Sequence, residues 1–451
     1  MENVEAAYQS TLDYLYSFVD YSLTRSLRYS PEKFDLGRMV ALAEALGAPH
    51  RQYPVVHVAG TKGKGSTCAM IASVLQTAGY KVGLYTSPHL VDYTERIQVN
   101  RQPVSHEQLV ALVARLKPEV AKIERLTTFE LTTAAAFLLF AEEKVDIAVV
   151  EVGLGGRLDA TNIVDPLVSV ITSLSLDHMN VLGDTLEKIA AEKGGIIKPG
   201  RPVVVAHQKA EAAAVLKKIA KERHAPILFT DDAYFASLTR HSLAGQEFTV
   251  RSAAGNNGSS QASHFSLPLL GAHQVQNALT AYAALKVINK TGIKISSAAI
   301  RKGFGAVSWP GRFEILQNDP LVVIDSAHNL DSAEKLAQTI RDYLPGRSIS
   351  LVFGASEDKD VTGMLGALSP VIERVMVTQS VHPRSYDAVQ LAEAARKFGL
   401  PVAVDTQLES ALVQAFASLK PDGVLVITGS IFIAAGARQY WLEKKNVLKH
   451  A

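Results

Sequence analysis

The chain has 451 residues, of which 47% are apolar and 20% charged, and its formal net charge is +2 at pH 7. This length exceeds one ordinary hydrophobic core, so we expect two domains; the small net charge gives no electrostatic reason to expect nucleic acid as the main partner. The apolar runs are too short for a membrane span, the amino terminus lacks a basic apolar leader, and Cys68 is the single cysteine. We therefore expect a cytoplasmic protein with no membrane attachment and no internal disulfide.

Apolar runs alternate with helical periodicity along most of the chain, which is typical of α/β proteins with largely parallel sheets. In the first part of the chain, the pattern predicts strands at residues 54–59, 81–85, 145–151, 167–172 and 202–206, and helices at 105–124, 130–143, 185–194, 209–222, 274–288 and 296–304. Between them, ERIQVNRQPV is expected to form a small hairpin that turns through Asn100 and Arg101.

The segment PVVHVAGTKGKGSTCAMIASVL, residues 54–75, joins the first strand to a helix through a glycine-rich turn. Backbone N–H groups at such a turn point toward one spot and bind phosphate there. Lys64 adds a positive charge, and Ser66 adds a hydroxyl suited to a metal ion. The spacing departs from the usual phosphate loop, because Val58 stands where a glycine is usual and Gly65 separates Lys64 from Ser66. A plain glycine turn would explain the glycines but not the two lysines inside it, so we predict a nucleotide phosphate site.

Polar groups follow several of the predicted strands. Glu151 ends VDIAVVE, while Asp177 and His178 end PLVSVITSLSLDH. In open α/β sheets the carboxyl ends of the strands line the ligand crevice, where magnesium that bridges phosphates would satisfy a buried carboxylate. The structural alternatives are a salt bridge for Glu151, a satisfied structural histidine at 178 and a simple turn role for Ser87 in TSPHL. Lys193, in EKGGIIKPG, stands near this cation site, an awkward place for a lysine unless it is modified or holds phosphate.

Residues 231–268 differ from their surroundings. They contain short polar segments and the low-complexity stretch SAAGNNGSSQASH, which predicts a flexible β-hairpin tip in an ordinary surface insertion. The proline and glycine of VSWPGRFE predict an interdomain linker, so we expect domains at residues 1–307 and 308–451. For the second domain, the pattern predicts a compact doubly wound arrangement with strands at 320–325, 349–353, 373–378, 401–404 and 423–428.

A last group of candidates spans the predicted linker. Asn277 lies in GAHQVQNALTA, Arg312 in WPGRFE, and Asp325 and His328 in VIDSAHN. Arg312 is either an ordinary surface charge or a phosphate clamp that acts when the two domains close.

These motifs together resemble one family. GTKGKGS, TSPHL, TTFE, EVGLGGRLDATN, LDH, EKGGIIKPG, HQVQNA, WPGR and DSAHN occur in the order seen in folylpolyglutamate synthases, which are Mur-type amide ligases, and they cover essentially the whole chain. The resemblance implies an α/β fold with a P-loop-type ATPase domain, built on a mostly parallel sheet, and a smaller doubly wound, Rossmann-like carboxyl-terminal domain. TSPHL combined with LDATN is most similar to bifunctional members that also act as dihydrofolate synthase. Members with only the polyglutamylating activity often carry another residue at the position of His89.

The resemblance also implies roles for individual residues. The residues that match a nucleotide site are Thr61, Lys62, Gly63, Lys64, Gly65, Ser66, Asn277, Arg312 and Asp325. The magnesium ligands are matched by Ser87, Glu151 and His178, and the pterin-binding positions by Phe34, Asp35, Leu36, Thr127, Thr128, Phe129, Glu130, Leu158, Asp159 and Ala160. Lys193 matches a lysine that is carbamylated in the family, which turns the awkward positive charge into an anion. Lys64, Lys193 and His328 are the expected catalytic residues.

Two positions depart from the family pattern. Lys62 stands where Asn is usual, and Gly194 stands where Ala is usual. Lys62 would add a phosphate contact or crowd the site with positive charge, so we expect altered nucleotide affinity rather than lost activity.

The implied reaction starts with transfer of the γ-phosphoryl group of ATP to a carboxylate, because a carboxylate itself has no adequate leaving group. L-Glutamate then attacks the acyl phosphate, while magnesium, Lys64 and Arg312 neutralise charge. His328 would orient or deprotonate the amine, and Arg384 in HPRS would pair a carboxylate in the glutamate pocket. The expected partners are ATP, L-glutamate and dihydropteroate or folates, and the expected state is a monomer.

Three other interpretations compete with this one. A regulatory nucleotide switch would need a guanine-selecting Asn-Lys-x-Asp element, but the chain offers only NKTG at residues 289–292. A Mur-type ligase with another acceptor, such as a cell-wall precursor, shares the chemistry and is disfavoured only by TTFE and LDATN. A synthase restricted to polyglutamylation is a further alternative.

Overall fold

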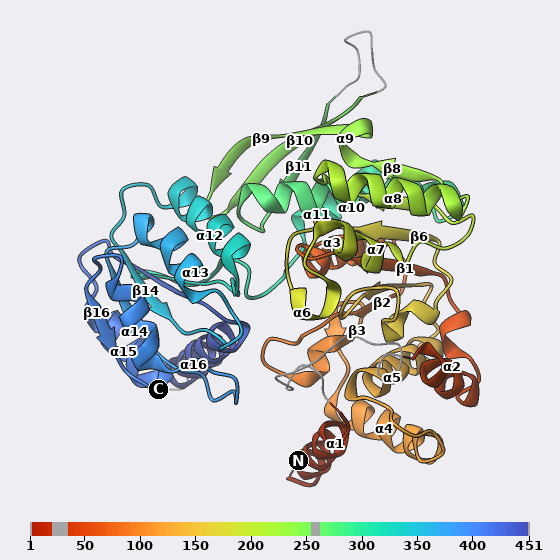
Figure 1. Ribbon diagram of the computed structural model, residues 1–451, viewed down its shortest axis with the longest axis horizontal. Helices are drawn as coiled ribbons and strands as arrows, with labels where there is room; N and C mark the ends of the chain where they lie inside the picture. Colours follow the sequence, from red (N-terminus) through yellow and green to blue (C-terminus); the bar gives the residue numbers. More distant parts are fainter. Residues whose placement is uncertain (1, 20–34, 254–261, 450–451) are drawn as a thin grey trace. The chain divides into compact units, whose positions relative to one another are not determined.

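A computed structural model describes residues 2–19, 35–253 and 262–449 (Figure 1). Contacts within the chain define two compact units. The first consists of residues 1–239, 247–267 and 274–307, and the second of residues 240–246, 268–273 and 308–451. One boundary between the units therefore lies between residues 307 and 308. Two short earlier segments, 240–246 and 268–273, also belong to the second unit.

The first unit is built on a mostly parallel sheet, as predicted. Its eight strands run in the order β4-β3-β2-β5-β1-β6-β7-β8, and only β3 runs antiparallel to the others. β1, β5 and β6 are buried along their whole length, which explains their continuous apolar runs. The bounds are β1 Val55–Ala59, β2 Val82–Tyr85, β3 Ile97–Val99, β4 Gln102–Pro103, β5 Ile147–Glu151, β6 Val168–Ile171, β7 Val203–Val205 and β8 Ile227–Phe229.

The predicted hairpin is confirmed in β3 and β4. Asn100 and Arg101 both have positive φ angles, 51° and 61°, as a tight turn between two strands requires.

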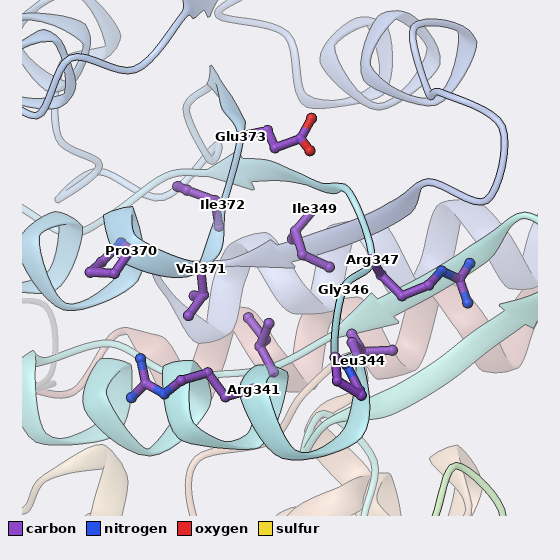
Figure 2. Close-up of a pocket in the computed structure, with 11 residues that line it drawn as sticks. Arg341, Leu344, Gly346, Arg347, Ile349, Pro370, Val371, Ile372 and Glu373 are labelled. Atoms are coloured by element: carbon purple, nitrogen blue, oxygen red, sulfur yellow. The ribbon is translucent and has the colours of Figure 1, made fainter.

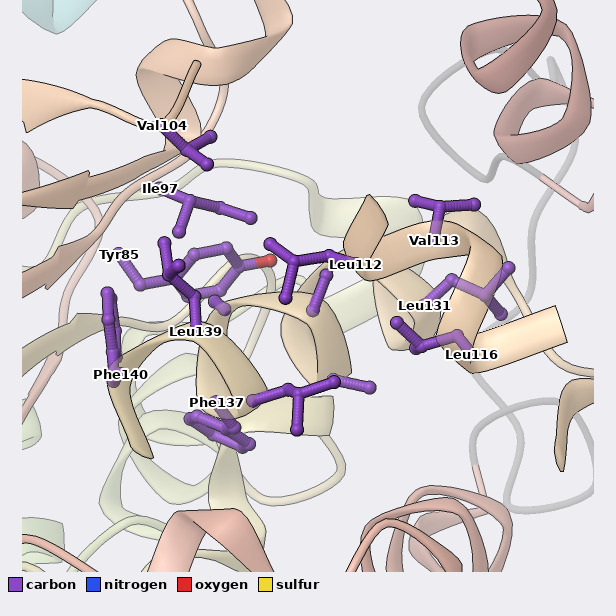
Figure 3. Close-up of a cluster of buried hydrophobic side chains, with 14 of the residues drawn as sticks. Tyr85, Ile97, Val104, Leu112, Val113, Leu116, Leu131, Phe137, Leu139 and Phe140 are labelled. Carbon is purple, nitrogen blue, oxygen red and sulfur yellow. The ribbon is translucent and has the colours of Figure 1, made fainter. Parts of the chain in front are cut away.

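Helices cover both faces of this sheet (Figure 1). α3 (Lys64–Thr77) contacts β1, β2 and β5, and α11 (Ser297–Gly305) packs on α3. On the other face α4 and α5 bury their apolar side chains against Tyr85 and Ile97, and Phe137 and Phe140 are fully buried members of this core (Figure 3). The remaining helices of this part are α1 Glu2–Tyr16, α2 Leu36–Ala45, α4 His106–Val120, α5 Thr128–Glu142, α6 Met179–Leu182, α7 Leu186–Gly194, α8 Ala210–Glu222, α9 Thr230–Ala233 and α10 Ala272–Ile288.

The insertion at residues 231–268 is more regular than expected. β9 (Tyr234–Ser242), β10 (Gly245–Ser252) and β11 (Ser263–Leu267) form a three-stranded sheet in the order β11-β10-β9. Most of the low-complexity stretch, residues 254–261, lies outside the described residues.

The second unit contains the predicted doubly wound pattern. Six strands run in the order β12-β13-β17-β14-β15-β16, and only β12 is antiparallel. The strands are β12 Glu314–Asn318, β13 Leu321–Ile324, β14 Ile349–Phe353, β15 Arg374–Val377, β16 Val402–Val404 and β17 Val424–Thr428; the helices are α12 Leu330–Tyr343, α13 Val361–Leu368, α14 Ala388–Arg396, α15 Leu408–Ala417 and α16 Ile431–Lys449. In the described part of the chain, no helix combines the length and apolarity that a membrane crossing needs.

The packing of α11 on α3 yields a test of the first unit. A Cβ atom added at Gly303 would lie 2.5 Å from Cα of Val74, whereas one added at Gly305, in the same helix, would meet nothing within 4 Å. Gly303→Ala should therefore lower the free energy of unfolding by about 1–3 kcal/mol, because backbone must move apart. Gly305→Ala is the matched control and should be neutral or slightly stabilising. Urea unfolding measures both, and equal effects would contradict this packing.

Candidate active site

The glycine-rich turn has the geometry of a phosphate loop. It follows β1, and Gly63, with φ 83°, is the residue that precedes α3. A Cβ atom at Gly60 (φ 153°) would lie 1.8 Å from Oγ1 of Thr172, and one at Gly63 would lie 2.2 Å from Oδ1 of Asn277. The turn is thus held against the end of β6 on one side and α10 on the other. Asn277 lies beside this turn, and its contact with the nucleotide stays a prediction.

Three further predicted residues meet at the carboxyl edge of the sheet. Glu151, at the end of β5, is 4% exposed, and its Oε1 lies 3.8 Å from Nζ of Lys64. The backbone N–H of Ser87, which follows β2, donates to Oε2 of the same carboxylate at 3.3 Å. β1, β2 and β5 are neighbours in the sheet, so their carboxyl ends bring these groups together.

The donor set at this edge fits magnesium. The Glu151 carboxylate and the Ser87 hydroxyl would supply oxygen ligands, which Mg²⁺ prefers, and this ion usually keeps water and phosphate oxygens as its other ligands. Among the described residues there is no group of three or more His, Cys, Asp or Glu side chains placed to hold a metal.

His178 lies in the loop after β6. It has a left-handed backbone conformation (φ 49°) just before α6, and its side chain is about half exposed. Its Nε2 is 3.9 Å from Oδ1 of Asp177, and its backbone N–H donates to the same oxygen at 3.0 Å. The assignment of His178 as a magnesium ligand stays a prediction.

The structure gives Lys62 a partner that the sequence did not suggest. Its Nζ lies 2.9 Å from Oδ2 of Asp177, and both side chains are largely buried. The extra positive charge of the loop is therefore balanced by the acid that precedes His178. A basic residue in the turn and an acid after β6 were both visible in the sequence, but only the parallel pairing of β1 with β6 brings them into contact.

Lys193 is buried at the carboxyl end of α7. The loop after Glu151 packs tightly on this end, since a Cβ atom at Gly156 would lie 2.8 Å from the carbonyl oxygen of Glu192. Burial, followed by the nearby Lys64 charge, lowers the pKa of Lys193 to about 7, while Asp177 and Asp159 act in the opposite direction. A large fraction of this amine is thus neutral near pH 7.

The unusual Gly194 also has a structural explanation. A Cβ atom there would lie 2.6 Å from Cδ1 of Ile219 and 3.1 Å from Cδ2 of Leu216, both on α8. The side chains of α8 occupy the space that an alanine would take.

Three segments predicted to bind the pterin lie close to one another. Glu130 accepts hydrogen bonds from Thr127 at the start of α5, and Nε of Arg38 on α2 donates to it at 3.3 Å. The partly exposed ring of Phe129 lies against Gly153, where a Cβ atom would be 2.5 Å from Cζ. Asp35 caps α2 through the N–H of Gly37, and Phe34 lies outside the described residues. Leu36, Thr128, Leu158 and Ala160 belong to these same segments: Leu36 begins α2, Thr128 begins α5, and Leu158 and Ala160 flank Asp159.

The carboxylate of Asp159 accepts its hydrogen bonds from groups of its own loop. The carboxylate is buried and accepts from the N–H groups of Gly153, Leu154 and Thr161, each at 3.0 Å, and from the Thr161 hydroxyl. Burial raises the pKa of Asp159, and these hydrogen bonds act against that shift. Asp159 therefore shapes the loop, and its direct contact with a substrate stays a prediction.

His89, the position associated with bifunctional members, is held by an arginine that the sequence did not indicate. Nε of Arg96 donates to Nδ1 of His89 at 2.9 Å, and the guanidinium lies 4.9 Å from the centre of the Tyr93 ring. Burial, then the charge of Arg96, lowers the pKa of His89 to about 3, so its imidazole is neutral.

In the second unit, Asp325 and His328 follow β13. Asp325, which is partly buried, accepts from the N–H groups of Phe313 and Ala327 at 2.8 Å; its burial raises its pKa, and Arg312 opposes the shift. Nδ1 of His328 lies 2.8 Å from the carbonyl oxygen of Ser326. A carbonyl only accepts, so Nδ1 carries the proton and Nε2 carries the lone pair in the neutral ring. Arg384, the suggested glutamate contact, has a buried Nε without a hydrogen-bond partner in the described part of the chain.

A cavity of about 320 Å³ in the second unit is not part of this site (Figure 2). Ile349 and Glu373, which line it, stand at the amino ends of β14 and β15. Asp325 follows the carboxyl end of β13, at the opposite edge of the sheet.

Comparison with known families gives a match to both parts of the chain. Residues 58–285 match the Mur ligase middle domain, and residues 311–431 match the Mur ligase glutamate ligase domain. The dihydrofolate synthase/folylpolyglutamate synthase of Bacillus subtilis is 39% identical over 434 residues, covering 94% of this chain and 99% of the relative. The Escherichia coli protein of the same name is 36% identical over 403 residues, covering 89% and 90%.

Solved structures agree with these relatives. Mycobacterium tuberculosis folylpolyglutamate synthase complexed with ADP superposes with a TM-score of 0.87 at 34% identity, covering 97% of this chain and 99% of the other. E. coli FolC in complex with DHPP and ADP gives a TM-score of 0.85 at 33% identity, covering 97% and 98%.

The pairing of Lys62 with Asp177 leads to a prediction. Lys62→Asn leaves Asp177 without its 2.9 Å partner beside the phosphate loop. The negative charge that Lys62 now balances should then weaken nucleotide binding and raise the KM for ATP about three- to tenfold, with a smaller change in kcat. The double variant Lys62→Asn/Asp177→Asn removes both charges and should recover most of the loss. An unchanged KM for ATP in the single variant would contradict this role.

Proposed function

The chain belongs to the dihydrofolate synthase/folylpolyglutamate synthase family of Mur ligases, and on that premise we propose that it joins L-glutamate to dihydropteroate, to the glutamate tail of folates, or to both, at the expense of ATP. The proposal rests mainly on one observation. Lys64, Glu151 and Ser87 lie close together beside a phosphate loop, at the carboxyl edge of a parallel sheet. The pterin-matching residues Phe129 and Asp159 both contact the loop that follows Glu151, at Gly153.

The chain's own residues suit activation of a carboxylate. The backbone of Thr61 to Ser66 cradles phosphate oxygens, and the Lys64 ammonium neutralises charge as the γ-phosphoryl group passes to the acceptor carboxylate and ADP leaves. Magnesium, held by Ser87 and Glu151 with His178, would supply further charge neutralisation when bound. The product of this step is an acyl phosphate, whose leaving group is phosphate.

For residues of the second unit we propose the roles that the family resemblance implies. Arg312 and Asp325 are the proposed nucleotide contacts, and Asn277 of the first unit is a third. The tautomer of His328, with its lone pair on Nε2, suits acceptance of a proton from the glutamate ammonium before attack on the acyl phosphate. We also propose a cytoplasmic monomer; the small net charge and the single, buried Cys68 support the location, and light scattering tests the monomer.

The test of the function is glutamate-dependent ADP release. Dihydropteroate, tetrahydrofolate and a cell-wall precursor are offered in turn, each with its amino acid and with ATP and magnesium. Activity with both pterins identifies a bifunctional enzyme, and activity with tetrahydrofolate alone identifies a polyglutamylating enzyme. Activity only with the wall precursor, or nucleotide binding without any acceptor-dependent turnover, would overturn the proposal. In single-turnover experiments, His328→Ala should lower the rate of amide formation by a larger factor than it raises the Kd for ATP.

We further propose that Lys193 is carbamylated. Its burial and lowered pKa make the neutral amine available to attack CO₂, forming the carbamate and releasing a proton. An anion at this position would balance Lys64 and assist the cation site.

The proposed modification predicts a pH and CO₂ dependence. Since the pKa falls from 10.5 to about 7, the amine is mainly protonated and unreactive below pH 7 and mainly neutral above it. Carbamylation should therefore be lost as the pH falls through about 7, and activity in CO₂-depleted buffer should recover on addition of bicarbonate. Lys193→Ala should lose at least about a hundredfold in kcat and regain part of it with acetate or formate. Full activity of Lys193→Ala would exclude the role.

A further inference from the structure

A fully buried histidine in β1 takes no part in the mechanism above. Nε2 of His57 lies 2.8 Å from Oγ1 of Thr161, in the short helical turn at Ala160–Ile163, and the hydroxyl of Thr161 donates to Oδ1 of Asp159. Since an ionised carboxylate only accepts, the hydroxyl proton is committed to Asp159, and Thr161 must accept from His57. This assigns the proton of the imidazole to Nε2.

Two other observations agree with that assignment. Nδ1 of His57 is buried and has no hydrogen-bond partner among the described residues, as a bare acceptor nitrogen would. Burial, with a smaller effect of Lys198, lowers the pKa of His57 to about 3, so the ring stays neutral near pH 7. The imidazole is thus a fixed donor of one hydrogen bond and not a titrating group.

From Asp159 the contacts lead to the pterin-matching segments. The other carboxylate oxygen, Oδ2, accepts from the N–H groups of Gly153 and Leu154. Gly153 lies directly against the ring of Phe129. One chain of contacts therefore runs from His57 through Thr161, Asp159 and Gly153 to the ring of Phe129. This ring is the partly exposed side chain of the TTFE motif.

The nucleotide side of the site has a separate support. Glu151 is fixed by the sheet, where it lies opposite Val58 of β1, and by the N–H of Ser87. Loss of the His57 hydrogen bond would loosen the loop beyond Glu151 without moving the carboxylate of Glu151.

We propose that His57 is a positioning residue for the carboxylate acceptor: it acts through Thr161 on Asp159 and so holds the loop that faces Phe129. The inference rests on the proposed function, because the acceptor is the pterin compound of that reaction. His57 would set the affinity for this substrate and leave ATP binding unchanged.

The experiment compares three substitutions at one position. His57→Gln carries an N–H group the same number of bonds from Cα as Nε2, His57→Asn carries one a bond closer to the backbone, and His57→Leu carries none. The KM for the pterin acceptor should rise about tenfold in the Leu and Asn variants and by less than about threefold in the Gln variant. The KM for ATP should change by less than about twofold in all three. Thr161→Val should raise the acceptor KM about as much as His57→Leu does. The double variant should have an acceptor KM no higher than that of the more affected single variant.

Controls separate positioning from a general loss of buried polarity. Ser169 lies opposite His57 in β6, is fully buried, and donates to the carbonyl oxygen of Ile196 at 2.8 Å. Ser169→Ala should lower the melting temperature and leave the acceptor KM unchanged. ¹⁵N spectra of the wild-type histidines should show a neutral, Nε2-protonated ring that is missing in His57→Gln. An Nδ1-protonated or charged ring would overturn the assignment.

The outcomes also distinguish this inference from the function on which it rests. A wild-type chain without pterin- and glutamate-dependent ADP release refutes both. An active wild type with an unchanged acceptor KM in His57→Leu, or with equal rises in the KM values for acceptor and ATP, refutes the positioning role alone.

Discussion

The site depends on the absence of side chains at Gly60 and Gly63. At both positions a Cβ atom would overlap an oxygen of a neighbouring residue, Thr172 in one case and Asn277 in the other. The positive φ angles of the two residues exclude most other amino acids independently. Because the turn can approach β6 and α10 this closely, Lys64 begins its helix within reach of Glu151. The position of the cationic side chain is thus set by backbone packing and not by an attraction between charges alone.

The fold was largely predictable because its elements have simple sequence signals. Strands that are buried on both faces, such as β1 and β17, leave continuous apolar runs, and the helices between them have clear periodicity. The strand β9 was not predicted, since its mostly exposed side chains lack such a run, whereas β10 and β11 are the strands on either side of the predicted hairpin tip. The division of the chain at 307–308 has a local signal in proline and glycine. The membership of residues 240–246 and 268–273 in the second unit depends on long-range contacts and has none.

The candidate site shows the same distinction. Glu151 and Ser87 could be identified because each ends a predicted strand, and parallel strands place their carboxyl ends along one edge. The partners of Lys62 and Glu130 could not be identified from the sequence. Asp177, the partner of Lys62, and Arg38, the partner of Glu130, come from segments that are brought close only by strand order and helix packing. His57 was hidden for a different reason. A histidine within an apolar strand looks like an ordinary core residue until the hydroxyl of Thr161 is seen beside it.

The close contact between Gly194 and Ile219 has a consequence for exchanging parts with related enzymes. The volume that the family's usual alanine would fill at the end of α7 belongs in this chain to side chains of α8. These two helices form one steric unit, so a chimera that imports α7 from a relative should tolerate it only together with the matching α8. A chimera with the foreign α7 alone that melted like its parent would show that the two helices are interchangeable separately.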